Sequence, residues 1–353
     1  MNQDLIILLP GQTSSGFLEV IQEAVEGYSG QIITRAIDIP SLQNKKILWA
    51  VELDEYGLNL SLEEMLQKIS QRGEKSLINS QGAIIVQSPV ELWTKCTAYR
   101  IIFQTNQLGC LYMGHSLVEA TRNLVNFLTW QKQFNISLSE IYQKHSRNLV
   151  RRLIENDKKT FKEPKILVLY SNPGKTSNTM MLWQMVKGYI SYNRDYLVQQ
   201  HVENGTIVDC HGCLYKTCQH YSERKSCFYG GIVVQEILPA IEKADYIVWL
   251  CPNYNDSLSA KMMAVINRLT VLYKRVDFYN KTFFAIIVSG NSGSENVAMQ
   301  LIGALNVNKG FRLPPYFVLT AIANDPGAVK QIPGIQEKAK KFALNICKEI
   351  DIQ

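Results

Sequence analysis

The chain has 353 residues, enough for about two domains at roughly 150 residues each. Hydrophobic residues make up 46% and charged residues 19%, which is ordinary for a globular protein and excludes a disordered chain. Lys and Arg (37) exceed Asp and Glu (31) by six, too small an excess to indicate a nucleic-acid-binding protein.

We expect neither a membrane anchor nor a secretory leader. The apolar stretches are far shorter than the roughly 18 residues of a membrane-spanning helix. The first residues, MNQDLIILLPG, have no basic segment before a short apolar run, and that run fits a buried strand. The expected location is therefore the cytoplasm.

Short apolar runs alternate with helical stretches throughout the chain, a pattern typical of α/β folds. In the first part the predicted strands are Leu5–Leu9, Ile32–Ile37, Lys46–Leu53 and Gly82–Val86. The predicted helices are Gly16–Glu26, Leu62–Gln71, Glu91–Thr105, Ser116–Gln133 and Leu138–Glu155. Ser88 with Glu91, and Ser116 with Glu119, fit capping boxes at two helix starts.

A polar, charged segment closed by Pro164 follows the last of these helices. Proline disfavours helix in the residue before it, so we expect a linker at residues 156–164. The linker separates an N-terminal α/β domain of unclear role, residues 1–155, from a second domain at residues 165–353.

The second part repeats the order strand, turn, helix. Its predicted strands are Lys165–Tyr170, Thr206–Asp209, Tyr246–Cys251, Thr282–Ser289 and Tyr316–Thr320. Its predicted helices are Thr179–Tyr189, Ile232–Lys243, Ser259–Tyr273, Glu295–Leu305 and Ile335–Ile350. Several strands are continuously apolar, as in a doubly wound parallel sheet of five strands with both faces covered. Such sheets bind ligands beyond the carboxyl ends of their strands.

The loop after the first strand of this domain is rich in hydrogen-bond donors and opens a helix. A helix start favours an anion such as phosphate, because its first N–H groups have no intrahelical partner. The alternative is plain helix capping by Ser177 or Asn178. The candidate phosphate-binding residues are Ser171, Asn172, Pro173, Thr176, Ser177, Asn178 and Thr179.

The triplet Gly174-Lys175-Thr176 does not make a nucleoside-triphosphate loop. That motif needs a glycine five positions before its second glycine, and position 169 is Leu.

Two further loops follow the third and fourth strands of the domain. Proline stops the third strand and an aromatic residue follows, whereas glycines after the fourth let the backbone approach a ligand closely. Ordinary surface turns are the alternative for both loops. The candidate residues are Pro252, Asn253, Tyr254, Asn255 and Asp256 in one loop, and Ser289, Gly290, Asn291, Ser292 and Gly293 in the other.

These features carry a resemblance over about residues 165–320. A strand followed by Ser-x-x-x-x-x-x-Asn-Thr, and then Ala244-Asp245 before a strand ending in Pro-x-Tyr, resembles the flavodoxin-like NAD(P)H-dependent FMN reductase family. Within that family the four-cysteine loop is most similar to the iron–sulfur flavoproteins. The resemblance implies FMN, with its phosphate on residues 171–179 and its ring between the loops at 252–256 and 289–293. It also implies transient reduction by NAD(P)H, and a homodimer or larger homo-oligomer.

Four cysteines fall within 18 positions: Cys210, Cys213, Cys218 and Cys227. Four thiolates can hold an iron–sulfur cluster or a zinc ion, and His211 and His220 would compete as zinc ligands. Reduced cysteines without metal are the third alternative. The gap of four residues between Cys213 and Cys218 is longer than the usual gap in the relatives that the chain resembles.

Two main functions remain open at this point. The first is an FMN-dependent oxidoreductase that NAD(P)H reduces and that passes electrons to a quinone, a flavin or a similar small-molecule or protein acceptor. The second is an iron–sulfur flavoprotein that carries electrons and has no small-molecule substrate of its own. A cysteine-based sensor is a third alternative, but such a sensor would not need a phosphate loop.

Overall fold

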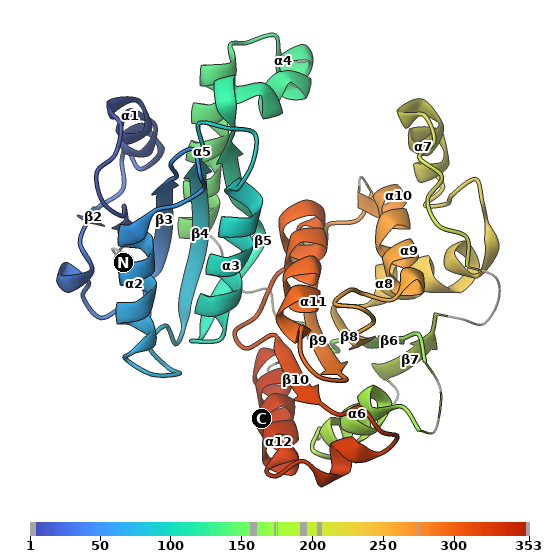
Figure 1. Cartoon of the computed structure of the whole chain (residues 1–353). Helices are drawn as coiled ribbons and strands as arrows, with labels where there is room; N and C mark the ends of the chain where they lie inside the picture. Colours follow the sequence, from blue (N-terminus) through green and yellow to red (C-terminus); the bar gives the residue numbers. More distant parts are fainter. Residues whose placement is uncertain are drawn as a thin grey trace. The chain divides into compact units, whose positions relative to one another are not determined.

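A computed structural model describes residues 5–155, 161–172, 174, 176–190, 196–202, 207–273 and 275–350. The chain divides into two compact units, residues 1–158 and 159–353 (Figure 1). The linker predicted at 156–164 begins with residues 156–160, which lie outside the described residues. None of the described helices is long and apolar enough to cross a membrane.

The N-terminal unit is a five-stranded parallel sheet in the order β2-β1-β3-β4-β5. Its strands are β1 (Leu5–Leu8), β2 (Gly30–Ile33), β3 (Lys46–Glu52), β4 (Ser80–Gln87) and β5 (Cys110–Ala120). Its helices are α1 (Ser15–Ala24), α2 (Leu60–Ser70), α3 (Thr94–Asn106), α4 (Leu128–Phe134) and α5 (Leu138–Glu155), with short turns of helix at η1 (Ala36–Asp38) and η2 (Arg122–Phe127).

The C-terminal unit is also a five-stranded parallel sheet, in the order β10-β9-β8-β6-β7. Its strands are β6 (Ile166–Tyr170), β7 (Leu197–His201), β8 (Tyr246–Pro252), β9 (Thr282–Ser289) and β10 (Val318–Ile322). Its longer helices are α6 (Asn178–Gly188), α7 (Tyr215–Ser222), α8 (Leu238–Lys243), α9 (Ala260–Arg268), α11 (Ser294–Leu301) and α12 (Ile335–Ile350). Shorter or wider helical segments are η4 (Val233–Ile237), α10 (Thr270–Tyr273), η5 (Phe278–Asn280), η6 (Ile302–Lys309) and η7 (Ala328–Gln331).

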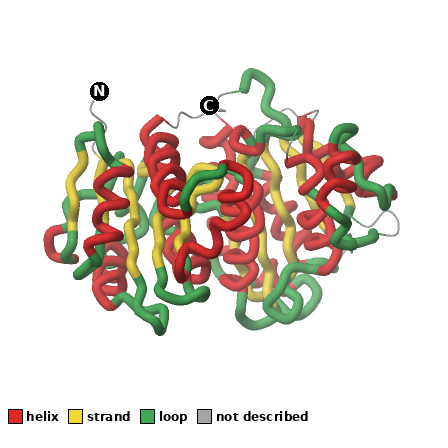
Figure 2. The backbone as a smooth tube through the Cα atoms, turned by 90° about the horizontal axis from the view of Figure 1, so that it is seen from above, coloured by secondary structure: helices red, strands yellow, loops and turns green. Residues whose placement is uncertain are grey.

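The two units share one topology. Counted along each unit, both sheets run second, first, third, fourth, fifth strand, which is the flavodoxin-like order. Helices cover both faces of each sheet (Figure 2), so the central strands are buried on both sides. All eight residues of β9 are buried, as are the first six of β3. The fold class predicted from the sequence is confirmed.

Each unit packs its first and last helices on the same face of its sheet. In the N-terminal unit, Phe17 of α1 and Leu149 of α5 join a buried cluster with the side chains of the central strands. In the C-terminal unit, Trp183 of α6 and Phe342 of α12 do the same. Burying apolar area in these clusters stabilises the sheets by about 25 cal/mol per Å².

The predicted second strand of the C-terminal unit is wrong. The strand is Leu197–His201, and of the predicted Thr206–Asp209 the described residues 207–209 lie outside any strand. β7 is the edge strand beside β6, and none of its five residues is buried. Its sequence therefore lacks the continuous apolar run that marks a buried strand.

The predicted helix Ser116–Gln133 is wrong in its first part, because Cys110–Ala120 is the edge strand β5. Between the pairs Gly82–Tyr112 and Ile84–Leu117, β5 advances five residues while β4 advances two. This irregularity breaks the alternation that would have revealed a strand. Neither predicted capping box forms: Ser116 lies in β5, and α3 begins at Thr94 after Trp93, whose φ is +79°.

Gly82 makes room for a buried tyrosine. A Cβ at Gly82 would lie 2.5 Å from Cε1 of Tyr112, which is fully buried and whose hydroxyl lies 2.7 Å from Oγ1 of Thr105. We therefore expect Gly82→Ala to lower the free energy of unfolding by about 1–3 kcal/mol through overpacking.

The matched control is Gly16→Ala on α1, where nothing lies within 4 Å of the added Cβ. Because alanine favours helix, this change should leave stability equal or raise it by up to about 1 kcal/mol. Urea unfolding midpoints compare the two variants, and equal midpoints would contradict the overpacking argument.

Candidate functional site

The loop between β6 and α6 is shaped by its own polar side chains. Asn172 Oδ1 accepts the N–H of Gly174 at 2.9 Å, and Ser177 caps α6 by accepting the N–H of Met180 at 3.3 Å. Pro173 lies outside the described residues. The N–H groups of Asn178 and Thr179 begin the helix, where no intrahelical carbonyl reaches them. The start of α6 therefore suits an anion.

Asn178 holds two loops together through its side chain. Its Nδ2 donates to the carbonyls of Ala323 at 3.0 Å and Asp325 at 2.8 Å, and its Oδ1 accepts the N–H of Val329 at 3.3 Å. The amide thus fastens the segment after β10 to the start of α6. Both polar atoms of the Asn178 side chain are thus engaged, so the group that Asn178 can offer to an anion is its backbone N–H.

A second helix start lies beside this loop. Ser171, which follows β6 and is 6% exposed, receives a hydrogen bond from the hydroxyl of Ser259 at 3.2 Å. Ser259 caps α9. A cavity of about 510 Å³ is lined by Ser171, Tyr254 and residues 258–261. The sequence analysis placed Ser259 at a helix start but did not assign it to the site.

The loop after β8 is a tight two-residue turn. Tyr254 and Ser257 exchange both backbone hydrogen bonds at 3.1 Å, and Asn255 and Asp256 between them have φ of +51° and +58°. Asn and Asp tolerate this conformation better than other non-glycine residues. Gln300 of α11 fixes the turn, because its side chain bonds Leu258 N at 3.0 Å and the Asp256 carbonyl at 3.2 Å. The turn presents Tyr254 to solvent at 47% exposure.

Asn253 joins the loop after β8 to the loop after β9. Its Nδ2 donates to Ser289 Oγ at 3.0 Å and to the Ser292 carbonyl at 2.9 Å. Gly293 has φ of +83°, and a Cβ there would overlap the Asp256 carboxylate. Glycine is thus required at this close approach. The buried Oδ1 of Asn253 has no hydrogen-bond partner in the described part of the chain.

A cavity of about 490 Å³ opens between these two loops. It is lined by Asn253, Asn255, Asp256, Gly290, Asn291 and Asn324. Asn324 comes from the loop after β10 and was missed, because nothing in the sequence separates it from an ordinary turn residue. The Asn291 side chain accepts the N–H of Ser292 at 2.6 Å, so that N–H is already bonded within the loop.

The predicted residues therefore fall into three groups. Those that line the two cavities are Ser171, Asn253, Tyr254, Asn255, Asp256, Gly290 and Asn291. Those that shape or support the loops are Asn172, Ser177, Asn178, Ser289, Ser292 and Gly293. Pro252 ends β8, Thr179 is buried in the first turn of α6, and Thr176 is exposed.

The four cysteines of the cluster line one cavity of about 240 Å³, with aromatic walls from Tyr221, Phe228 and Tyr229. Arg268 of α9 binds this loop through the carbonyls of Val208 at 3.2 Å and Gly230 at 2.7 Å. Burial, followed by the charges of the other three thiols, raises the pKa of Cys218.

The placement of these cysteines does not fit a metal centre. Among the described residues, which include all four cysteines, no three His, Cys, Asp or Glu side chains are arranged to hold a metal ion. His211 stacks on Tyr229 at 4.1 Å between ring centroids, and His220 packs edge-on against Tyr221 at 5.4 Å. The arrangement thus supports neither the iron–sulfur cluster nor the zinc site considered from the sequence.

In the N-terminal unit, Glu52 bonds the start of α1, the helix that follows the first strand as α6 does in the C-terminal unit. It is the last residue of β3, as Pro252 is of β8. Its carboxylate accepts hydrogen bonds from Ser14 N–H at 2.7 Å, Ser14 Oγ at 2.6 Å and Gln87 Nε2 at 3.3 Å. Ser14 caps α1, which follows the first strand. A protein carboxylate therefore bonds the residue that caps the first helix of the N-terminal unit.

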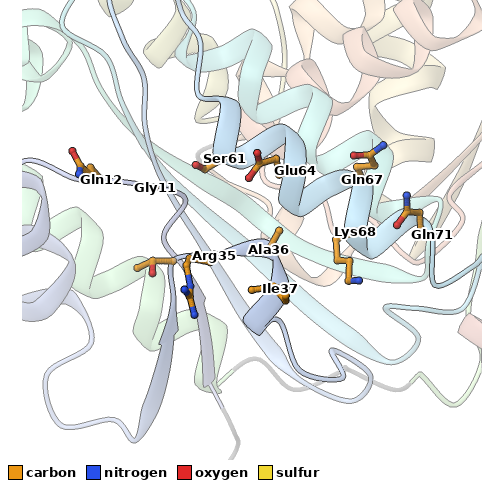
Figure 3. Close-up of a pocket in the computed structure, with 11 residues that line it drawn as sticks. Gly11, Gln12, Arg35, Ala36, Ile37, Ser61, Glu64, Gln67, Lys68 and Gln71 are labelled. Carbon is orange, nitrogen blue, oxygen red and sulfur yellow. The ribbon is translucent and has the colours of Figure 1, made fainter.

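The N-terminal unit also has an open groove of about 720 Å³. Figure 3 shows Ser61, Glu64, Gln67 and Lys68 of α2 along one wall, and residues 35–37 along the other. Arg35 points away from α2 and pairs with Asp38 at 2.7 Å. Most of the residues that line the groove are of polar type, and we assign it no catalytic role.

Asn178 allows a test that separates a structural role from a phosphate-binding role. We expect Asn178→Ala to lower the stability of the flavin-free protein by about 1–3 kcal/mol, because two carbonyls and one N–H lose their partner. Thr176→Ala, an exposed truncation in the same loop, should leave stability unchanged. Thermal unfolding without FMN compares the variants. An Asn178→Ala protein that keeps its stability and loses only FMN affinity would refute the structural role of Asn178.

Comparison with known proteins finds a family similarity within the C-terminal unit. Residues 164–325 match the family model of NADPH-dependent FMN reductases. No curated protein matches the chain. Similar solved structures include a flavodoxin, WrbA-like protein from Agrobacterium tumefaciens, which is 12% identical, with 54% of this chain and 98% of that chain covered and a TM-score of 0.35.

Two further solved structures are similar to about half of the chain. An FMN-dependent NADH-azoreductase from Bacillus anthracis in complex with FMN is 13% identical, with 52% and 99% of the two chains covered and a TM-score of 0.36. A putative quinone reductase from Klebsiella pneumoniae is 15% identical, with 53% and 84% covered and a TM-score of 0.37. Over residues 164–325, this chain is thus similar to the NADPH-dependent FMN reductases, a family of oxidoreductases, as the sequence resemblance predicted.

Proposed function

We propose that the protein is an FMN-dependent oxidoreductase that NAD(P)H reduces and that passes electrons to a quinone, a flavin or a similar small acceptor. The observation that carries this proposal is the family match over residues 164–325, which spans the three loops at the carboxyl edge of the second sheet. Two cavities, of about 510 and 490 Å³, lie between those loops. Doubly wound sheets bind their ligands at this edge.

The residues at this edge fit FMN. The start of α6, with Ser171, Asn172, Pro173 and residues 176–179, would hold the phosphate. The loops at 252–256 and 289–293 would flank the ring. The unpartnered Oδ1 of Asn253 is a buried acceptor, and a donor on a ligand would satisfy it. FMN supplies the redox chemistry, taking a hydride from a nicotinamide and releasing electrons singly or in pairs.

The protein's own residues bind and orient in this proposal. Gln300 and Asn253 hold the turn at Asn255 and Asp256 in one position, so the ring would meet a preformed wall. Tyr254 is exposed beside the cavity and would cover the ring or offer its hydroxyl. Remaining N–H groups of the loop at 290–293 would favour negative charge on the ring. No general acid or base is assigned.

We further propose that each chain binds one FMN, in the C-terminal unit alone. The N-terminal unit has the same strand order, but Glu52 occupies the start of α1 through Ser14. A phosphate there would meet a carboxylate instead of free donors, and like charges repel.

We propose a homodimer or larger homo-oligomer in the cytoplasm, with the helical stretches at Ser259–Tyr273 and Glu295–Leu305 as interface elements. The electron-carrier alternative rests on one observation, that four cysteines line a single cavity. It requires a cluster that those cysteines, as they are placed, do not fit.

A spectroscopic titration tests the main proposal. Anaerobically purified protein should show flavin absorption that bleaches when NADPH is added, before any dithionite. Iron measured on the same sample should be well below one atom per chain, because the thiols are not arranged around a common centre. Colourless protein that takes up no FMN would overturn the proposal. Stoichiometric iron would favour the electron carrier if it is lost in Cys218→Ser and retained in Cys96→Ser, which lies outside the cysteine cluster.

Gly293→Ala tests the ring-flanking loops in the same assay. Since its Cβ would displace Asp256, FMN should be held roughly tenfold or more weakly. Gly334→Ala is the matched control, because Gly334 also has a positive φ, +73°, but nothing lies within 4 Å of the added Cβ. Equal flavin retention in the two variants would count against this loop as part of the site.

Glu52→Ala tests the assignment of the N-terminal unit. Removing the carboxylate takes the acceptor from two exposed donors of Ser14, which water can replace in part, so stability should fall by about 0.5–1.5 kcal/mol. Inorganic phosphate should then raise the melting temperature of Glu52→Ala more than that of the wild type or of Glu64→Ala, a control on the exposed face of α2. A flavin content of two per wild-type chain, or no extra response to phosphate, would refute the assignment.

A further inference from the structure

The chain turns back on itself as soon as α7 ends. Lys225, whose φ is +52°, donates its N–H to the carbonyl of Ser222 at 2.9 Å. The next N–H, that of Ser226, reaches the carbonyl of Tyr221 at 3.1 Å. A left-handed residue with these two hydrogen bonds is the Schellman motif, which reverses the chain at a helix end. Cys227 therefore begins a segment that returns beside the last turn of α7.

This reversal brings Cys227 to the face of α7 that carries Cys218. Residues three apart share a helix face, so Cys218 and Tyr221 lie on the same face. The ring of Phe228, which follows Cys227, packs edge-on against the ring of Tyr221 with 5.6 Å between the centroids. Both cysteines line the same cavity of about 240 Å³.

The charges of the thiols agree with this placement. Burial raises the pKa of the Cys218 thiol, and the charge of Cys227 raises it further, by more than the charges of Cys210 and Cys213 do. The interaction of two charges weakens with distance, which places Cys227 nearest to Cys218. A disulfide joins Cα atoms about 4.4–6.8 Å apart, the scale of one helical turn of about 5.4 Å. The reversal within the last turn of α7 brings the pair to that scale.

Both thiols are free and half-buried, and the cavity that they line lies at the surface. Its wall residues Tyr215 and Phe228 are 63% and 61% exposed, so a small reagent can enter. Two thiols suffice for a disulfide. A metal centre would need at least three ligands, and the described residues do not bring three together.

Positive charge at the cavity favours thiol chemistry. The guanidinium of Arg268 is held at the wall by the carbonyls of Val208 and Gly230. The ammonium of Lys309 donates to Oγ1 of Thr270, another wall residue, at 2.9 Å. Nearby cations stabilise thiolates, and the thiolate is the nucleophile in thiol–disulfide exchange.

We propose that Cys218 and Cys227 form a redox-active dithiol that low-molecular-weight disulfides oxidise reversibly. The Cys227 thiolate attacks one sulfur of the small disulfide, whose S–S bond breaks and releases one thiolate. Cys218 then gives its proton to solvent and attacks the Cys227 sulfur, which releases the second thiolate. The two cysteines lose two electrons and two protons, and the small disulfide becomes two thiols.

This dithiol is separate from the site proposed for FMN. Its cavity shares no lining residue with the two cavities at the carboxyl edge of the second sheet. The proposal therefore stands or falls independently of the function proposed for that edge.

Equilibration of the full-length protein, as purified without oxygen, with reduced and oxidised glutathione tests the proposal. After acid quenching and alkylation, peptide mass spectrometry should find one disulfide, between Cys218 and Cys227, that forms and disappears as the glutathione ratio changes. The effective concentration of the two thiols should be at least roughly tenfold higher in the folded protein than in the same chain unfolded in urea, because folding holds the pair together. This comparison needs no substitution.

Serine variants then assign the two steps. Cys218→Ser should stop at the mixed disulfide, with glutathione on Cys227. Cys96→Ser, an exposed change outside the cluster, and Cys210→Ser within it should keep the disulfide between Cys218 and Cys227. Flavin content should be the same in all variants, which separates this site from the FMN site.

Three outcomes would overturn the proposal. One is the absence of the disulfide between Cys218 and Cys227 even in fully oxidised glutathione. Another is an equal effective concentration in the folded and the unfolded chain, which would show chance pairing. The third is a main disulfide that joins other cysteines, such as Cys210 and Cys213.

Discussion

The parallel pairing of β6, β8 and β9 is the constraint on which the candidate site depends. Leu169 pairs with Trp249, and Trp249 pairs with Ala285, so the three strands rise together. Parallel strands in register deliver their following loops to the same edge. Segments more than a hundred residues apart in the chain, from Ser171 to Asn291, therefore line neighbouring cavities. The strands themselves are held by burial on both faces.

Side chains cross between the loops at this edge and join them by hydrogen bonds. Asn253 reaches the loop after β9, Gln300 of α11 reaches the turn after β8, and Asn178 reaches the segment after β10. Each of these amides bonds backbone groups, which fixes loop shape without adding charge to the site. A preformed wall lowers the entropy that a ligand loses on binding.

The two units show how one strand order supports different chemistry. β3 and β8 are each seven residues long and are central in their sheets, but one ends in Glu52 and the other in Pro252. A carboxylate at that point accepts hydrogen bonds from the capping serine of α1, whereas the side chain of proline offers no acceptor. Near the ends of β4 and β5, the buried hydroxyl of Tyr142 has no hydrogen-bond partner among the residues that the structure describes. Fold alone does not assign a function to either unit.

The sequence by itself determined the elements whose signal is local. Three elements match the prediction at both ends: the buried strand Thr282–Ser289 and the amphipathic helices Leu138–Glu155 and Ile335–Ile350. A strand that is buried throughout has a continuous apolar sequence, and a helix buried on one face has apolar residues at helical spacing, so both can be recognised in the sequence. The three loops after β6, β8 and β9 could also be placed at one edge from the sequence, because the carboxyl ends of parallel strands lie at the same edge of a sheet.

Only the tertiary structure decided the features that depend on distant partners. β7 is an exposed edge strand and β5 is irregular opposite Gly82, so neither carried a clear pattern. Glu52 at the end of β3 accepts a hydrogen bond from Ser14 at the start of α1, and Asn178 of α6 donates to a carbonyl after β10. The buried hydroxyl of Tyr142 meets no partner among the described residues. Each of these outcomes depends on groups from separate elements. A sequence lists the donors and acceptors, but whether each one meets a partner is settled only when the strands and helices pack.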